Sequence, residues 1–457
     1  MSKEKKEKNP NKLGAGTFLL WCGNGTSMAV QSVVLGILTI YCTNALGMDA
    51  MLVGTILMFS KLIDSVTDLC AGYLVDRTNT KIGRGRPYDL CILGLWLFTW
   101  LLFTVPASLS TPVKCAWIFI CYALCQSVFR TFLTAAGTPY MVRAFNNEQK
   151  YVKISSLGGL LTTCVIMVFN VITPMLYANI ISDAAGWSRL IGFFAIPMTI
   201  IGMLRFFFIP EKYVVEDTKE QRATFKEVLS LLKGNKYIYI IAILQIAVGM
   251  AGSLGVAGYY FLYIVGNVAI SGVISLFSIV AMLSLIFYPM LLKKISTKQL
   301  IEFSLLVSIP YGIIGFIAKD NLTLLAIQGV LMGFVTLPAS YMSGLLIIDC
   351  ADYNEYKGHP RMEGSFGSIS GFAYKVGGAL ATFVSGGLLS LCGFNGAASE
   401  QPASAIMAIR ACNSLVPMLF FLTAAAAMHF YDLDKKKPEI AEELAKKREA
   451  LQEREEM

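Results

Sequence analysis

Long apolar stretches alternate with short polar ones along most of the 457-residue chain. Many of the apolar stretches hold 18 or more residues with few charges, the length of helix that crosses about 30 Å of hydrocarbon. The pattern therefore predicts an all-α, polytopic membrane protein with twelve transmembrane helices. Their predicted bounds are 16–43, 51–75, 88–106, 115–140, 155–180, 189–209, 237–265, 269–292, 299–318, 321–348, 363–392 and 405–431.

The placement of basic residues predicts the orientation of these spans. Of the 38 Lys and Arg residues, 31 fall in polar segments on one side of the predicted membrane. These segments are 1–12, 76–87, 143–153, 205–236, 293–298, 349–361 and 432–457. Because basic residues stay on the cytoplasmic side, both termini are predicted to be cytoplasmic. The net charge of +8 thus reflects topology and predicts no nucleic-acid partner.

Other composition signals exclude several classes of site. The eleven Cys residues lie mostly within spans at irregular spacing, which is typical of small buried hydrophobic side chains. With only two His residues, a His-based metal site is not expected. No nucleophile–base pair or His/Cys cluster is apparent, so we predict that the protein is not an enzyme.

A charged segment divides the chain into two halves of six spans each. Six spans, a cytoplasmic linker and six more spans are the plan of the major facilitator fold, in which two six-helix bundles rock around a central site. The tail has mixed charges at helical spacing, which predicts a solvated cytoplasmic helix or, alternatively, a helix that docks on a partner. The predicted parts are an N-terminal bundle at 1–209, a linker at 210–236, a C-terminal bundle at 237–431 and a tail at 432–457.

Three charged residues share one face of the second predicted span. Lys61, Asp64 and Asp68 are separated by three and four residues, so they form a stripe on a helix. A charge at mid-bilayer costs about 2.5–3.5 kcal/mol, and the stripe must therefore face water or be neutralised. Two carboxylates one turn apart offer oxygen ligands to an alkali ion, or a shared proton site, and Thr67 can add a hydroxyl. The alternative is a Lys–Asp pair that holds helices together.

Two further polar segments are predicted at the cytoplasmic mouth. We interpret them as an ion-paired latch between the two halves, although the first also suits a simple topology signal. Small residues in both halves, Gly72 and the glycines around Lys375, predict close helix contacts. Lys375 lies about three turns into the eleventh span, and either Lys375 or Lys61 can neutralise the empty site and compete with an ion for the carboxylates. The latch residues are Asp76, Arg77, Arg84 and Arg86 in the first half, and Asp352, Glu355, Arg361 and Glu363 in the second.

The two polar segments resemble the signatures of the glycoside–pentoside–hexuronide:cation symporter family. The first signature runs from Asp64-x3-Asp68 through Asp76-Arg77-Thr78 to Pro87; the second runs from Asp352-Tyr353-x-Glu355 through Glu363-Gly364 to Lys375. The resemblance implies a major facilitator fold and the import of a sugar or glycoside with Na⁺, Li⁺ or H⁺. It also implies that Asp64 and Asp68 bind the cation, that Thr134 supplies a hydroxyl, and that Lys375 lies near both sites.

The sugar-binding positions depart from this resemblance. Melibiose-type members place one Asp in the first span and one in the fourth, where this chain has Met28 and Gly137. Arg130, four residues before Thr134, instead suggests that an acidic substrate such as a hexuronide is bound, because Arg suits bidentate carboxylate recognition. The alternative is that Arg130 pairs with Asp64 or Asp68. Tyr374 is a further candidate for contact with substrate hydroxyls.

These observations predict a secondary active transporter of sugars or glycosides that works by alternating access. Its expected location is the cytoplasmic membrane of a bacterium, and no cofactor beyond the coupling ion is expected. Two other functions stay open, an uncoupled facilitator and a carrier of lysolipid-type solutes in the same superfamily.

Overall fold

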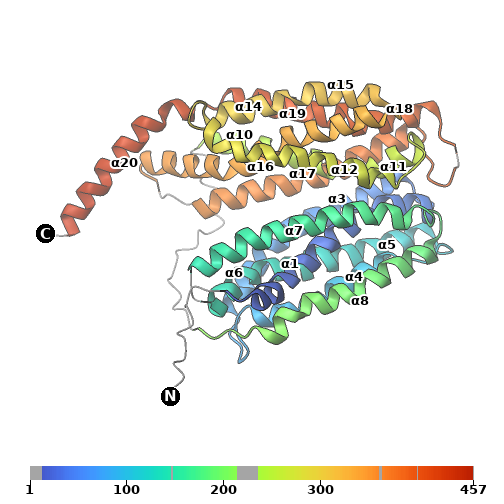
Figure 1. Cartoon of the computed structure of the whole chain (residues 1–457), viewed down its shortest axis with the longest axis horizontal. Helices are drawn as coiled ribbons and strands as arrows, with labels where there is room; N and C mark the ends of the chain where they lie inside the picture. The colour runs from blue at the N-terminus through green and yellow to red at the C-terminus, as the bar shows by residue number, and fades with distance from the viewer. Residues whose placement is uncertain (1–12, 146–147, 214–234, 360–362, 399, 456–457) are drawn as a thin grey trace, which may run out of the picture. The chain divides into compact units, whose positions relative to one another are not determined.

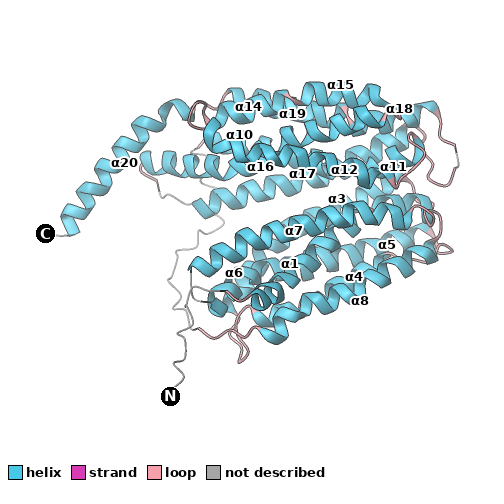
Figure 2. Cartoon of the chain, viewed as in Figure 1, coloured by secondary structure: helices cyan, strands magenta, loops and turns pink. Residues whose placement is uncertain are grey.

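The computed structural model describes residues 13–145, 148–213, 235–359, 363–398 and 400–455, and these are mostly helical (Figure 2). Within these ranges no β-strand forms, and Thr80 and Gly83 make an isolated bridge. In the part of the chain that the structure describes, ten helices are long and apolar enough to cross a membrane. The prediction of an all-α polytopic membrane fold is thus confirmed. The count of twelve spans and the orientation of the termini stay predictions, because shorter helices occupy two predicted spans, 88–106 and 269–292.

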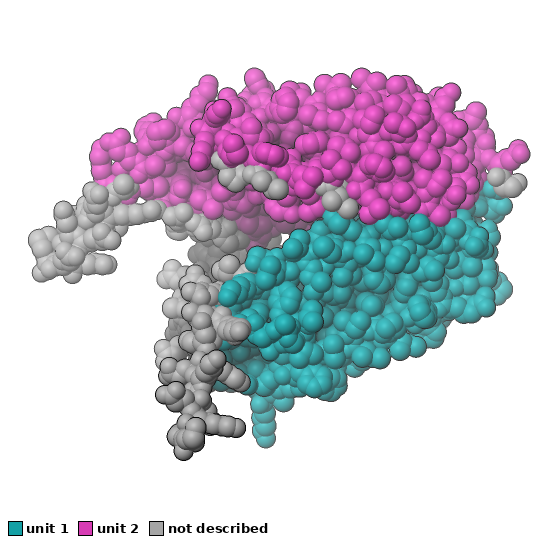
Figure 3. Space-filling view, viewed as in Figure 1, with its two compact units in different colours: residues 1–218, 395–399 teal, residues 219–394, 400–457 magenta. Residues whose placement is uncertain are grey.

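The chain divides into two compact units, coloured separately in Figure 3. Unit 1 comprises Met1–Thr218 with Asn395–Ser399, and unit 2 comprises Lys219–Phe394 with Glu400–Met457. Most of the predicted linker at 210–236 lies outside the described residues, which resume at 235.

In unit 1, α1 packs against both α7 and α8 (Figure 1). The α1–α8 contact is close because Gly23 has no side chain: a Cβ there would lie 2.5 Å from the carbonyl oxygen of Ile201. Small residues allow such backbone contact between membrane helices. The helices of this unit are α1 (Ala15–Gly36), α2 (Leu38–Ile40), η1 (Tyr41–Ala45), α3 (Ala50–Arg77), η2 (Arg86–Leu90), α4 (Cys91–Leu102), α5 (Thr111–Ala123), η3 (Leu124–Arg130), α6 (Thr131–Phe145), α7 (Glu148–Tyr177) and α8 (Ala184–Phe208).

One long helix of unit 1 changes its winding midway. The segments α5, η3 and α6 run without a break from Thr111 to Phe145, and η3 is a π-helix of seven residues. A π turn bonds each carbonyl to the fifth residue onward, so it changes which side chains face a given neighbour. The π segment ends directly before Thr131, a residue of the candidate site.

Unit 2 is built around the contact between α10 and α17. A Cβ at Gly249 would lie 2.1 Å from the carbonyl oxygen of Tyr374, and one at Gly377 would lie 2.2 Å from that of Ile246. The helices of this unit are α10 (Tyr237–Ser253), α11 (Ala257–Tyr263), α12 (Ile270–Met282), η4 (Leu283–Phe287), α13 (Tyr288–Leu291), α14 (Thr297–Leu306), α15 (Ser308–Ala318), α16 (Leu322–Tyr356), α17 (Glu363–Leu391), α18 (Ala403–Asn413), α19 (Leu415–His429) and α20 (Leu433–Glu455).

The predicted role of the glycines is confirmed for only some of them. Gly377 and Gly378 line close contacts, whereas a Cβ at Gly72 or Gly371 would meet open space. Within unit 1, therefore, no neighbouring helix makes the close contact that was expected at Gly72. A small residue permits close packing only where a neighbouring helix approaches it.

This difference predicts opposite effects for two alanine substitutions on α17. We expect Gly377→Ala to lower the thermal unfolding midpoint of the purified protein, because the added methyl group collides with backbone on α10. Gly371→Ala is the matched control and should leave the midpoint unchanged or raise it, since Ala favours helix by about 1 kcal/mol over Gly. Equal midpoints for the two variants would contradict the proposed packing.

The C-terminal helix α20 is docked on unit 2 rather than fully solvated. Ile440 and Leu444 are each 4% exposed and join the apolar core of the unit. Lys437 Nζ lies 2.7 Å from Asp349 Oδ2 on α16. Just before α20, Asp432 accepts a hydrogen bond of 2.7 Å from the Tyr237 hydroxyl. That bond, with nearby lysines, holds the pKa of Asp432 well below its usual range.

Candidate functional site

The charged stripe predicted on the second span lies on α3. Asp49 caps this helix by accepting a hydrogen bond of 3.0 Å from the Leu52 backbone amide, which fixes where the helix begins. From there α3 continues for 28 residues and carries Lys61, Asp64 and Asp68 on one face. The Asp64 side chain is half-buried and that of Asp68 is exposed.

The hydroxyl of Thr131, which directly follows the π segment η3, contacts both carboxylates of the stripe. Thr131 Oγ1 lies 3.1 Å from Asp64 Oδ1 and 3.0 Å from Asp68 Oδ1. The two carboxylate oxygens are therefore no further apart than the sum of these distances. Thr131 itself is 5% exposed. Three oxygens from two helices thus converge at one place, an arrangement suited to a small cation.

The two threonines predicted to add hydroxyl ligands bond instead to their own helices. Thr67 Oγ1 donates to the backbone oxygen of Asp64 at 3.1 Å. Thr134 Oγ1 donates to the backbone oxygen of Arg130 at 3.0 Å, and its side chain is exposed. In this structure, Thr131 and not Thr134 therefore lies at the carboxylates. The sequence contained one signal that pointed to Thr131: this residue directly follows Arg130, the only Arg within the fourth predicted span.

The Arg130 side chain reaches α1. Its Nη1 atom donates to Gln31 Oε1 at 2.6 Å and to the Met28 backbone oxygen at 3.3 Å. Gln31 is fully buried, and its Nε2 atom donates to Thr99 Oγ1 at 3.2 Å, which fixes the orientation of the amide. Both of these hydrogen-bond partners of the guanidinium are neutral, and the charge of Asp64 acts on it without a direct hydrogen bond.

The first latch segment is anchored within unit 1 by Glu211, which the sequence analysis did not single out. Its carboxylate accepts hydrogen bonds from the backbone amides of Arg84 at 2.9 Å, Gly85 at 2.8 Å and Arg86 at 2.7 Å. Successive amides of this kind form a nest for an anion. Gly83, with φ of +126°, allows the turn, and a Cβ there would collide with the Glu211 carboxylate.

A buried ion pair lies beside this anchor. Arg205 on α8 donates to Asp89 through Nε at 2.9 Å and through Nη2, and both side chains are almost fully buried. The Arg205 guanidinium also stacks over the rings of Trp21 and Tyr140 at 4.7 and 4.9 Å. The sequence held a signal that was missed: Asp89 lies at the start of one predicted span and Arg205 near the end of another, and opposite charges at such positions favour an ion pair.

The remaining predicted site residues are placed as follows. Tyr374 is exposed and Lys375 half-buried on α17 of unit 2, so their relation to the carboxylates of unit 1 stays a prediction. Asp352 and Glu355 are half-buried near the end of α16, and Arg77 is exposed at the end of α3. Arg361 and the side chains of Asp76 and Glu363 lie outside the described residues. The latch between the two halves therefore stays a prediction.

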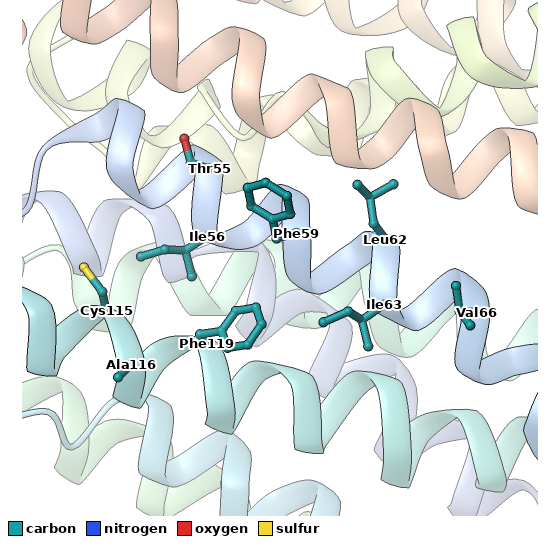
Figure 4. Close-up of a pocket in the computed structure, with 9 residues that line it drawn as sticks. All are labelled: Thr55, Ile56, Phe59, Leu62, Ile63, Val66, Cys115, Ala116 and Phe119. Atoms are coloured by element: carbon teal, nitrogen blue, oxygen red, sulfur yellow. The ribbon is translucent and has the colours of Figure 1, made fainter.

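An apolar pocket between α3 and α5 is distinct from this site (Figure 4). It is an open groove with a volume of about 610 Å³. None of the charged residues of the stripe lines it, and a sugar would leave its hydroxyls without partners there. Its lining residues are Thr55, Ile56, Phe59, Leu62, Ile63, Val66, Cys115, Ala116 and Phe119.

Comparison with known proteins supports a transport role. The model of the family "MFS/sugar transport protein" matches residues 20–435. The chain is 28% identical over 430 residues to an isoprimeverose transporter of Lactiplantibacillus pentosus, covering 91% of this chain and 88% of that protein. It is 26% identical over 437 residues to a glucuronide carrier protein homolog of Escherichia coli (strain K12), covering 90% and 91%. The predicted resemblance to cation symporters is confirmed.

Solved structures show the same fold. The crystal structure of the nucleoside transporter NupG superposes with a TM-score of 0.63 at 13% identity, covering 89% of this chain and 98% of that one. The crystal structure of a D-xylose-proton symporter superposes with a TM-score of 0.60 at 14% identity, covering 90% and 96%. The major facilitator fold predicted from the sequence is confirmed.

Proposed function

The chain belongs to the MFS/sugar transport protein family, whose members are membrane transporters and not enzymes, and from that premise we propose that it imports a sugar or glycoside together with a monovalent cation. The convergence of Thr131 on Asp64 and Asp68 carries this proposal, because three oxygens gathered around one point within the membrane suit a small cation. A putative glycoside/cation symporter of Escherichia coli (strain K12), 22% identical over 460 residues, supports the coupling.

Cation and substrate are coupled through alternating access in this proposal. The cation stabilises a conformation in which the substrate site has higher affinity, and reciprocity requires the substrate to tighten cation binding equally. Each positive charge that moves inward gains about 2.3 kcal/mol per 100 mV. At about 1.4 kcal/mol per tenfold, one charge supports roughly 40-fold accumulation of a neutral sugar. We place the protein in the cytoplasmic membrane of a bacterium.

Transport by purified protein in proteoliposomes tests this function. A panel of labelled glycosides and uronides is offered with an inward Na⁺ gradient, with an inward proton gradient, or with neither. We expect one gradient to drive a substrate above its external concentration. Equilibration with no accumulation under either gradient would support an uncoupled facilitator instead, and saturation by lysolipids alone would support a lipid carrier.

Arg130 favours an acidic sugar within this substrate class. Its guanidinium hydrogen-bonds to neutral partners on α1, and a substrate carboxylate would give it an anion to bind directly. A guanidinium offers five donors in a planar fork that matches a carboxylate. The acidic substrate is therefore the more specific form of the proposed function.

We expect Arg130→Gln to discriminate between charged and neutral substrates. Uptake of a glucuronide should fall about tenfold or more, the loss typical of a charge-assisted bond, while uptake of the matching glucoside should fall much less. Arg189→Gln, which removes an exposed Arg of the same unit, is the control. Equal losses for both substrates would mean that Arg130 serves the fold or the cation site.

A further inference from the structure

The side-chain amide of Gln31 on α1 is held in one orientation by two acceptors. Its Nε2 atom donates to Thr99 Oγ1 at 3.2 Å and to Cys125 Sγ at 4.0 Å. Each acceptor donates its own hydrogen to a backbone oxygen three or four residues earlier, Thr99 at 2.7 Å and Cys125 at 3.4 Å. A rotated amide would place its oxygen against these two atoms, which have no further hydrogen to donate. Gln31 Oε1 therefore points away from them, towards Arg130.

The guanidinium of Arg130 is held by α1 through one of its nitrogen atoms. Nη1 carries two hydrogens, and it donates to Gln31 Oε1 at 2.6 Å and to the Met28 backbone oxygen at 3.3 Å. A carboxylate that binds this guanidinium side by side must therefore use the edge formed by Nε and Nη2, which offers two parallel donors. Contact with α1 thus determines which edge of Arg130 is presented to a ligand.

The π segment η3 explains why one amide meets both Cys125 and Arg130. These two residues lie five apart in the segment, and the hydrogen bonds of a π turn join residues five apart. The winding therefore places the thiol and the stem of the arginine one turn apart on the side that faces Gln31. The same segment thus orients the amide and donates to its oxygen.

The charge of residue 31 decides whether the positive charge of Arg130 is paired directly within the protein. The Gln31 amide is fully buried and neutral, and it binds the guanidinium without cancelling its charge. Asp64 acts on that charge without a direct hydrogen bond. A carboxylate in the place of the amide would pair with the guanidinium directly and compete with the carboxylate of a substrate.

We propose that Gln31 is a positioning residue that makes the transporter select acidic over neutral sugars. Its neutral amide fixes the edge of Arg130 that a substrate meets, and it leaves the positive charge of the guanidinium to the substrate carboxylate. Gln31 acts through Arg130 and needs no contact with the substrate itself. This inference rests on the proposed function, because it concerns the substrate class of the same transporter.

Uptake kinetics of a β-glucuronide and of the β-glucoside with the same aglycone, measured in proteoliposomes, test this role. Gln31→Glu places an anion beside Arg130 while keeping the size of the side chain. Thr99→Val removes an acceptor that orients the amide and adds no charge, so it decides the question if Gln31→Glu does not fold. Thr163→Val is the matched control for Thr99→Val, because the Thr163 hydroxyl donates to the Gly159 oxygen of its own helix at 2.9 Å.

We expect Gln31→Glu to raise the KM for the glucuronide about tenfold or more, the effect of losing a charge-assisted bond, and to leave the KM for the glucoside within about twofold of the wild type. Thr99→Val should raise the KM for the glucuronide roughly 2- to 10-fold, because the loss of a neutral hydrogen bond loosens the guanidinium. The maximal rates should change little in both variants, and Thr163→Val should match the wild type.

Equal losses for the two sugars in either variant would overturn the inference, because they would show that Gln31 serves the fold of unit 1. An unchanged KM for the glucuronide in either variant would overturn it as well. So would a wild type that takes up the glucuronide no better than the glucoside; accumulation of the glucoside under a cation gradient would then leave the proposed function intact.

Discussion

Replacing either Asp64 or Asp68 by Asn is expected to abolish uphill accumulation of substrate. The amide keeps the size of the side chain but removes the charge that holds the cation, so the roughly 40-fold ratio available per 100 mV should fall to unity. Entry down a substrate gradient should continue, because the variant still has a substrate site. The measurement is the steady-state ratio of labelled substrate inside and outside proteoliposomes under an imposed, inside-negative membrane potential with the coupling cation present on both sides.

Asp49→Asn is the matched control for this prediction. It makes the same chemical change on the same helix, but at the N-cap, where Asn serves as well as Asp. Its accumulation ratio should match that of the wild type. Full accumulation in both carboxylate variants would show that these residues serve the fold and not the coupling.

The second large effect is expected at the buried pair of Asp89 and Arg205. Arg205→Leu leaves a buried carboxylate without its cation, which costs about 3–5 kcal/mol of unfolding free energy. Arg189→Leu on the same helix removes an exposed Arg whose pairing with Asp183 is worth about 0–1 kcal/mol. Denaturant unfolding of the purified protein compares the two variants. We also expect Asp89→Leu together with Arg205→Leu to be more stable than Arg205→Leu alone; a double variant less stable than both single ones would show that the pair itself is not what holds the charges in place.

The stripe on α3 could be predicted from the sequence because it depends only on the spacing of residues close together in the chain. Spacings of three and four residues place Lys61, Asp64 and Asp68 on one helical face. Because charge within a membrane is costly, that face is expected to serve a function. The long apolar stretches predicted the fold in the same way. Both inferences needed only helix geometry and the thickness of the bilayer.

The partners of that stripe could not be predicted because they depend on winding and on distant contacts. The resemblance suggested Thr134, but the π segment η3 changes the face that follows it, and Thr131 meets the carboxylates. Glu211 reaches a loop more than a hundred residues earlier in the chain, and no local spacing signals that contact. The docking of α20 on unit 2 was not predicted, because its apolar stripe is narrow. The buried Ile440 and Leu444 make the apolar contact, and the ion pair between Lys437 and Asp349 also holds the helix.

Ion entry driven by substrate is the most direct test of the central claim, that a cation held by Asp64 and Asp68 moves with the substrate. Proteoliposomes loaded with a Na⁺-sensitive or pH-sensitive dye receive a transported sugar in the absence of any imposed ion gradient. We expect the sugar to carry one of these cations inward, and the Asp64→Asn/Asp68→Asn double variant to admit sugar without the ion. Sugar entry without ion movement in the wild type, or unchanged ion movement in the double variant, would contradict the central claim.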